Sequence, residues 1–62
     1  MLKLKELRQN KGVTQKDVAM AIHCTTDCYS KYERGTRSPN INVLILLSKY
    51  FGVSIDYIVC ND

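Results

Sequence analysis

The chain has no tryptophan, only one proline and three glycines among its 62 residues, and no long apolar run. So little Pro and Gly, together with 45% hydrophobic and 24% charged residues, excludes a disordered, low-complexity chain and predicts a globular one. Because no segment could span a bilayer or serve as a signal peptide, we expect a cytoplasmic protein without a membrane partner. The length predicts a single domain, residues 1–62, with no second, ligand-sensing domain.

The residues that build metal and catalytic sites are also scarce. The three cysteines are an odd number, His23 is the one histidine, and Cys24 and Cys28 lack the two-residue gap common in zinc sites. Adjacent side chains do not normally face each other, so His23 and Cys24 do not predict a nucleophile and its base. We therefore expect no metal, no cofactor, no small-molecule ligand and no enzymatic activity. Cys28 stays open between a half-buried small side chain and a redox-sensitive thiol in the first turn of a helix.

Charge is distributed unevenly along the chain. The formal net charge is +3, with +3 in residues 1–13, +1 in residues 14–37 and −1 in the remainder. A basic balance favours a polyanionic partner. The carboxyl end is the part least suited to face that partner.

The stretch from Thr14 to Gly35 predicts two short helices joined by a tight turn. Thr14 is followed three residues later by Asp17, a capping-box acid, which starts a helix at Gln15. A second cap at Thr25 starts the next helix, and Gly35 ends it because glycine can adopt positive φ. At about 100° per residue, this second helix has one apolar face and one polar, partly basic face. The polar face holds Thr26, Asp27, Ser30, Lys31 and Arg34.

Three further helices flank this pair. They are expected at residues 2–11, 41–51 and 55–59. Gly12 and Gly52 end the first two of these, and Ser54 caps the last. The sequence thus predicts an all-α fold of five short helices around one core.

These residues resemble the Cro/repressor-type (XRE-like) helix-turn-helix family of DNA-binding domains. In the central stretch the resemblance is carried by Thr14, Gln15, Val18, Ala19, Ile22, Thr25, Tyr29, Ser30, Tyr32, Glu33 and Gly35. It continues through Arg37-Ser38-Pro39, Leu44, Leu47 and residues 51–58, so that it covers essentially the whole chain. The resemblance implies a five-helix lambda-repressor-like domain whose second and third helices form the helix-turn-helix, with double-stranded DNA as the partner.

Two residues depart from the family pattern. The family's turn is usually Gly followed by Val or Ile, whereas this chain has His23 and Cys24. Histidine is among the non-glycine residues enriched at positive φ, so we expect the turn to form at a cost of about 1–2 kcal/mol. Cysteine can fill the core position as a small hydrophobic side chain.

The polar face of the third helix suits the major groove, where bases differ in the donors and acceptors on their edges. Thr26 could contact a thymine methyl, Lys31 the acceptors of guanine, and Asp27 the amino group of cytosine. The candidate base contacts are Thr26, Asp27, Ser30 and Lys31. An acid that approaches phosphates is repelled unless it finds a donor, so Asp27 either narrows the tolerated sequences or weakens DNA binding.

The resemblance also implies contacts to the DNA backbone. In the family, the glutamine matching Gln15 commonly touches a phosphate, and the loop after the third helix runs along the backbone. The candidate backbone contacts are Gln15, Lys16, Arg34, Thr36 and Arg37, with ordinary solvated or first-turn side chains as the alternative. The family often pairs the arginine matching Arg8 with the glutamate matching Glu33, which would tie the first helix to the third.

The helix expected at residues 41–51 has more apolar surface than one small core can bury. Leu44, Leu47 and Phe51 form the expected core stripe, and a second apolar stripe lies beside it. We therefore expect a two-fold homodimer. Its candidate interface is Val43, Leu46, Tyr50 and Val59, which Cys60 could extend. The alternative is that Leu46 is folded under the carboxyl-terminal residues.

The function that follows is a sequence-specific transcriptional regulator, most simply a repressor. As a dimer it would read an inverted-repeat operator whose half-sites lie roughly 10 bp apart. The rival hypothesis is a protein-interaction module of the same fold, an antitoxin or anti-regulator, which docks a partner through the apolar face of the helix at 41–51.

Overall fold

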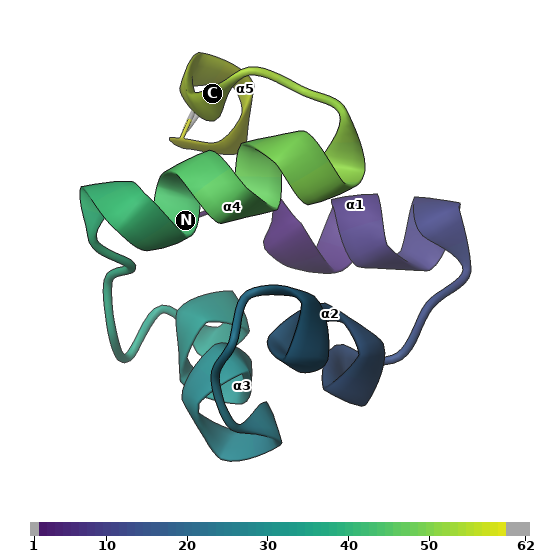
Figure 1. Ribbon diagram of the computed structural model, residues 1–62, viewed down its shortest axis with the longest axis vertical. Helices are drawn as coiled ribbons and strands as arrows, with labels where there is room; N and C mark the ends of the chain where they lie inside the picture. The colour runs from purple at the N-terminus through teal and green to yellow at the C-terminus, as the bar shows by residue number, and fades with distance from the viewer. Residues whose placement is uncertain (1, 60–62) are drawn as a thin grey trace.

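The computed structural model describes residues 2–59, which form five α-helices and no strand. These are α1 (Leu4–Lys11), α2 (Gln15–Ala21), α3 (Thr26–Arg34), α4 (Ile41–Phe51) and α5 (Ile55–Val59). The helices α2 and α3 lie together at one end of the molecule, α1 and α4 form a middle layer, and α5 covers the far side of α4 (Figure 1). The expected all-α architecture of five short helices is confirmed.

Side-chain caps start α2 and α3 where the sequence predicts them. The Thr14 hydroxyl accepts the Asp17 N–H at 3.1 Å, and the Asp17 carboxylate accepts the Thr14 N–H at 3.0 Å. This reciprocal pair is a complete capping box. The Thr25 hydroxyl accepts the Cys28 N–H at 3.1 Å and caps α3 in the same way.

The turn between α2 and α3 depends on one residue in the left-handed region. His23 has φ 61°, and it is the only non-glycine residue with positive φ in residues 2–59. That conformation allows the Cys24 N–H to reach back to the Ala19 carbonyl at 2.9 Å, which closes α2. Cys24 is half-buried and packs against the core, as expected for the residue that follows the turn.

The first helix is shorter than the sequence predicts. It was expected at residues 2–11, but it begins at Leu4, because Lys3 has non-helical angles and no side-chain cap. Instead, the Lys3 N–H donates to the Ile58 carbonyl of α5 at 3.1 Å. This long-range bond joins the two ends of the described chain, and no local pattern could have indicated it.

The core takes one fully buried side chain from every helix. Leu4, Val18, Tyr29, Leu47 and Ile58 come from α1 to α5 in that order, and each is 0% exposed. Burying an aliphatic or aromatic side chain of this size contributes about 1.5–3 kcal/mol. Because every helix contributes to the same cluster, α2 and α3 are held in place by all the others.

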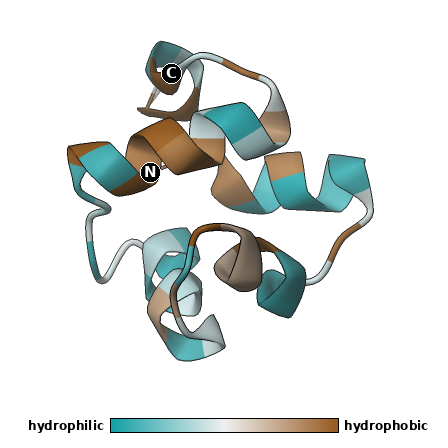
Figure 2. Cartoon of the chain, in the orientation of Figure 1, coloured by the Kyte–Doolittle hydropathy of each residue, from teal (hydrophilic) through white to brown (hydrophobic). Residues whose placement is uncertain are grey.

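The apolar surface of α4 differs from the one expected. Val43, Leu46 and Tyr50 are only half-exposed and pack against the core, because α4 lies against α1, α2 and α5. The apolar side chains that α4 leaves exposed are Ile41, at 60%, and Ile45, at 38%. Figure 2 shows the hydrophobic colour along much of α4, in contrast to the largely hydrophilic α3. Val59 is 37% exposed, and Cys60 lies outside the described residues.

Candidate nucleic-acid interface

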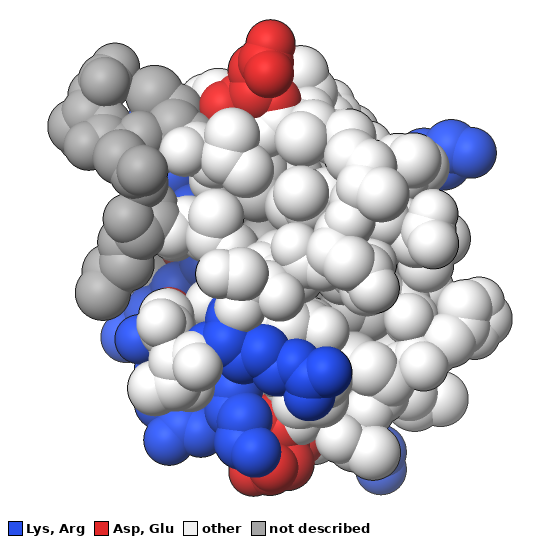
Figure 3. All heavy atoms as spheres, turned by 90° about the vertical axis from the view of Figure 1, so that its left-hand side faces the viewer, with Lys and Arg blue, Asp and Glu red and all other residues white. Residues whose placement is uncertain are grey.

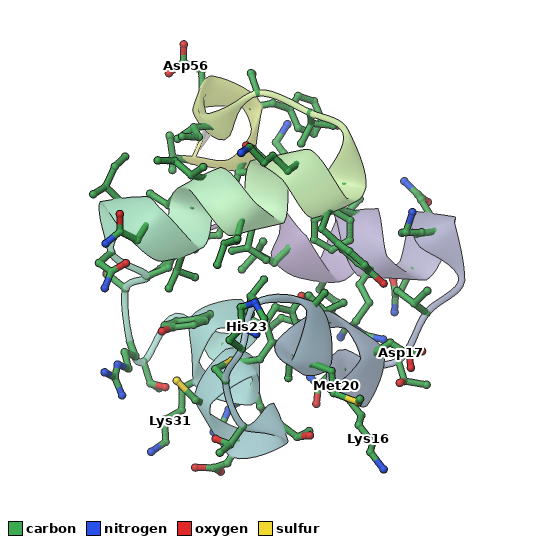
Figure 4. All side chains as sticks on the ribbon, viewed as in Figure 1. Lys16, Asp17, Met20, His23, Lys31 and Asp56 are labelled. Carbon is green, nitrogen blue, oxygen red and sulfur yellow. The ribbon has the colours of Figure 1, made fainter. Side chains whose placement is uncertain are left out.

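The outer face of α3 presents polar and charged side chains to solvent. Thr26 and Asp27 are exposed, whereas Ser30 and Lys31 are half-exposed. The Lys31 ammonium lies 3.4 Å from the Asp27 carboxylate, one helical turn away. Asp27 therefore has a cationic donor beside it, which offsets the repulsion expected between an acid and DNA phosphates. Lys31 itself extends away from the rest of the molecule (Figure 4).

Three more of the predicted contacts gather at the end of α3. Arg34 and Arg37 are exposed, and the Arg34 Nε donates to the Ser30 carbonyl at 3.4 Å. The Thr36 hydroxyl donates to the Lys31 carbonyl at 3.3 Å, so it also helps to end the helix. On the face of the molecule in Figure 3, Lys and Arg side chains are concentrated over α3 and the following loop, whereas the surface over α4 is almost uncharged.

An ion pair between α1 and α3 anchors this face. Arg8 Nε donates to Glu33 Oε2 at 2.6 Å, and the side chains are 16% and 4% exposed. Gln15 Nε2 donates to Glu33 Oε1 at 3.0 Å, which adds the start of α2 to the same group. One carboxylate therefore fixes the relative positions of three helices, and the Arg8–Glu33 pair implied by the family resemblance is confirmed.

The protonation states in this group are shifted in the directions that favour the charged pair. Partial burial alone would raise the pKa of Glu33, but the hydrogen bonds from Arg8 and Gln15 help to outweigh it and lower that pKa. The hydrogen bond to Glu33 raises the pKa of Arg8. Burial raises the pKa of Tyr29, whose buried hydroxyl lies beside Glu33 but too loosely to count as an ordinary hydrogen bond.

The pair α2 and α3, with its capped starts, tight turn and outward polar face, has the form of a DNA-reading unit. A family model described as "Helix-turn-helix" matches residues 4–58. The chain belongs to the helix-turn-helix family.

Curated relatives carry the same domain within longer proteins. The HTH-type transcriptional regulator ImmR of Bacillus subtilis is 40% identical over 60 residues, which cover 97% of this chain and 47% of that protein. The cryptic phage CTXphi transcriptional repressor RstR of Vibrio cholerae is 35% identical over 97% of this chain and 54% of its own length. The HTH-type transcriptional activator BcrR of Enterococcus faecalis is 35% identical over 97% of this chain and 29% of its own. The chain spans about half the length of ImmR and RstR, and less of BcrR.

Not all predicted contacts lie on one surface of this helix-turn-helix domain. Lys16 is exposed on α2 and points away from the core, apart from Lys31 (Figure 4). Gln15, Ser30 and Arg34 instead line a shallow cavity of about 610 Å³. Lys5 of α1 lines the same cavity. We call this cavity the α1–α3 hollow.

The sequence interpretation missed two features of the site. It did not assign Lys5, which counted only toward the basic amino-terminal segment, although it lies in the hollow with Gln15 and Arg34. It also did not anticipate that Gln15 donates to Glu33. Both features join residues from different helices, so the only available indication was the family's Arg8–Glu33 pair, which brings α1 next to α3.

The thiols of Cys24 and Cys28 add little to the site. The Cys28 thiol lies 3.5 Å from the Tyr32 hydroxyl, and burial raises the pKa of the Cys24 thiol. Both are free and half-buried.

Within residues 2–59, no three His, Cys, Asp or Glu side chains cluster as metal ligands would, and none of the helices has the length and apolarity of a membrane span.

Proposed function

We propose that this chain is a sequence-specific DNA-binding transcriptional regulator that reads base edges with the outer face of α3. The observation that carries the proposal is the polar outer surface of α3 within a helix-turn-helix domain, beside a concentration of Lys and Arg. A helix of this kind fits the major groove, where each base pair has its own pattern of donors and acceptors. The relatives' names, which include transcriptional regulators and a repressor, support the same conclusion.

The side chains divide between base and backbone contacts by their reach. Thr26, Asp27 and Lys31 extend from the first two turns of α3, where a helix that enters the groove by its amino end brings side chains to the bases. Their partners follow from chemistry: a thymine methyl, a cytosine amino group and guanine acceptors. Ser30 is the fourth proposed base contact, although it also lines the α1–α3 hollow.

The proposed backbone contacts are side chains that can donate to phosphate oxygens. Gln15 has one amide N–H bound to Glu33, which leaves its second N–H free for a phosphate. Arg34 and Arg37 are exposed at the end of α3 and in the loop after it. The remaining two contacts, Lys16 and Thr36, lie at the two ends of the helix pair.

The regulator would act as a homodimer on an inverted repeat. A single α3 reads few base pairs, whereas two copies would read half-sites roughly 10 bp apart. The predicted interface comprises Val43, Leu46, Tyr50 and Val59. The exposed Ile41 and Ile45 of α4 extend it. Occupying an operator in this way would repress transcription. A named activator among the relatives shows that the domain is also found in proteins with the opposite effect.

The same apolar surface supports the second candidate function, a module that docks another protein through α4. Ile41 and Ile45 are exposed, and Asp27 places a negative charge on the DNA-reading face. A module of this kind would have little affinity for DNA. The two functions therefore differ in their response to salt.

The test is the affinity for duplex DNA, measured by fluorescence anisotropy over a range of salt concentrations. A dimer with about six phosphate contacts should give a log–log slope near −5, because each contact releases condensed counterions. Arg37→Ala should make the slope shallower, and Lys49→Ala, which removes an exposed charge from α4, should leave it unchanged. Absence of binding to any duplex would contradict the regulator function and favour the docking module.

A further inference from the structure

The α1–α3 hollow holds more positive charge than its carboxylate can neutralise. It is lined by three cations, Lys5, Arg8 and Arg34, and by one acid, Glu33. The acid is already paired, because Arg8 Nε lies 2.6 Å from it. Within residues 2–59 the one other ion pair is Lys31–Asp27, so no described carboxylate neutralises Lys5 or Arg34.

Within residues 2–59, the hollow also contains hydrogen-bond donors without acceptors. Arg34 donates through Nε to the Ser30 carbonyl of its own helix, which leaves its terminal guanidinium nitrogens free. The Gln15 amide uses one N–H for Glu33 and has a second to give. Two free cations and an amide donor around one depression form a suitable site for an oxyanion, since Arg and Lys are the usual phosphate ligands.

The walls of the hollow indicate what carries that oxyanion. Sites for small organic molecules are lined mainly by hydrophobic and aromatic side chains. Among residues 2–59, Leu2 is the one apolar residue that lines the hollow and no aromatic ring does, so the remaining carbon surface comes from the stems of polar and charged side chains. A unit of the DNA backbone suits these walls, because its deoxyribose has a modest apolar edge and its phosphate carries the negative charge.

We infer that Lys5 of α1 is a further phosphate contact, which reaches in the α1–α3 hollow the same phosphodiester group as the proposed contacts Gln15 and Arg34. The inference rests on the proposed DNA-binding function. It adds a third helix to the interface, because Gln15 begins α2, Arg34 ends α3 and Lys5 lies in the first turn of α1. The Arg8–Glu33 pair, which joins α1 to α3, holds the two sides of the hollow together.

A neighbouring lysine provides a matched control. Lys3 lies two residues from Lys5, but its ammonium is 4.8 Å from the centre of the Tyr57 ring on α5. Lys3→Ala and Lys5→Ala therefore remove the same charge from the same segment, on different surfaces. Neither side chain takes part in the fully buried core, so both variants should fold, which thermal unfolding followed by circular dichroism would establish.

The experiment measures the salt dependence of binding to duplex DNA for the wild type and both variants. Lys5→Ala should weaken binding to all duplex sequences alike and make the log–log slope shallower by about 0.9 for each bound copy. Lys3→Ala should keep the wild-type slope. An unchanged slope in Lys5→Ala, with normal binding by the wild type, would overturn the inference and leave the proposed function intact. A wild type that binds no duplex would instead contradict the proposed function itself.

A second measurement separates a backbone phosphate from a free one. The wild type is titrated with inorganic phosphate at constant ionic strength while the Gln15 side-chain amide resonance is followed by NMR. If the hollow binds a phosphate of the DNA backbone, the resonance should shift when duplex DNA is added. It should show no saturable shift when inorganic phosphate alone is added. A saturable shift with phosphate alone would make the hollow a free-anion site and overturn its assignment to DNA.

Discussion

Glu33 is the residue on which the geometry of the proposed DNA-reading surface depends most. Its carboxylate accepts from Arg8 of α1 and Gln15 of α2, so one side chain sets the position of α3 against two other helices. Ion pairs of this kind do not reliably add net stability, but the loss of one partner leaves the other charge buried and unpaired. We therefore expect the pair to matter more for the shape of the site than for the total free energy of folding.

Glu33→Gln should lower the free energy of unfolding at neutral pH by about 3 kcal/mol, because Arg8 would keep its charge without a partner. This is the lower end of the usual range, since Arg8 retains some contact with water. Urea denaturation measures the change. The matched control is Asp27→Asn, which breaks the exposed pair with Lys31 and should cost about 0.5 kcal/mol or less.

The same variant should alter the pH dependence of stability. The folded-state pKa of Glu33 is lowered, so its contribution to stability is present above the unfolded pKa, about 4.3, and is lost as the pH falls through the folded pKa. Denaturation at several acidic pH values should show that the wild type loses this contribution, whereas Glu33→Gln has none to lose. Parallel curves for the two proteins would contradict the role assigned to Glu33.

At the scale of the elements, the helix ends set by local caps could be predicted, whereas an end set by a distant contact could not. Thr14 and Thr25 begin helices because their hydroxyls accept nearby N–H groups, which is a local interaction that the sequence displays. The start of α1 was misplaced because the Lys3 N–H is bound by Ile58, far away in the sequence. The hollow could not be foreseen for the same reason, since its lining comes from three helices.

The turn between α2 and α3 allows a test of strain in one element. His23 adopts φ 61° and its side chain is exposed, so replacing it removes strain without removing packing. His23→Gly should raise the free energy of unfolding by about 1 kcal/mol, which for a domain this small is a rise in Tm of about 4–8 °C. His23→Val should have the opposite effect, because a β-branched residue tolerates positive φ poorly. Equal Tm values for the two variants would rule out strain at this turn.

At the scale of the whole molecule, basic side chains and nearly uncharged surface occupy different parts of the face in Figure 3. Lys and Arg gather over α3 and the loop after it, whereas the neighbouring surface over α4 is nearly uncharged (Figure 3). Ile41 and Ile45 lie on α4 and are exposed. A dimer formed through α4 would leave both copies of α3 free to meet one duplex, and two-fold symmetry would then require an inverted repeat.

The candidate site could be predicted only where its residues are close together in the sequence. Lys31, Arg34 and Arg37 could be placed together from the helical period and one loop, and they are exposed or half-exposed as expected. Of the side chains predicted as a dimer interface, Val43, Leu46 and Tyr50 are half-buried, because α1 and α5 pack against α4. The pattern of α4 itself does not encode that packing.

The most direct test of the central claim is a selection from random duplex DNA, carried out with the wild type, Lys31→Ala and Arg34→Ala. If α3 reads base edges, the wild type should enrich an inverted repeat with half-sites roughly 10 bp apart. Lys31→Ala should change the enriched sequence at one position of each half-site, and Arg34→Ala should weaken binding without changing the sequence. Enrichment of no sequence by the wild type, or of the same sequence by Lys31→Ala, would contradict the claim.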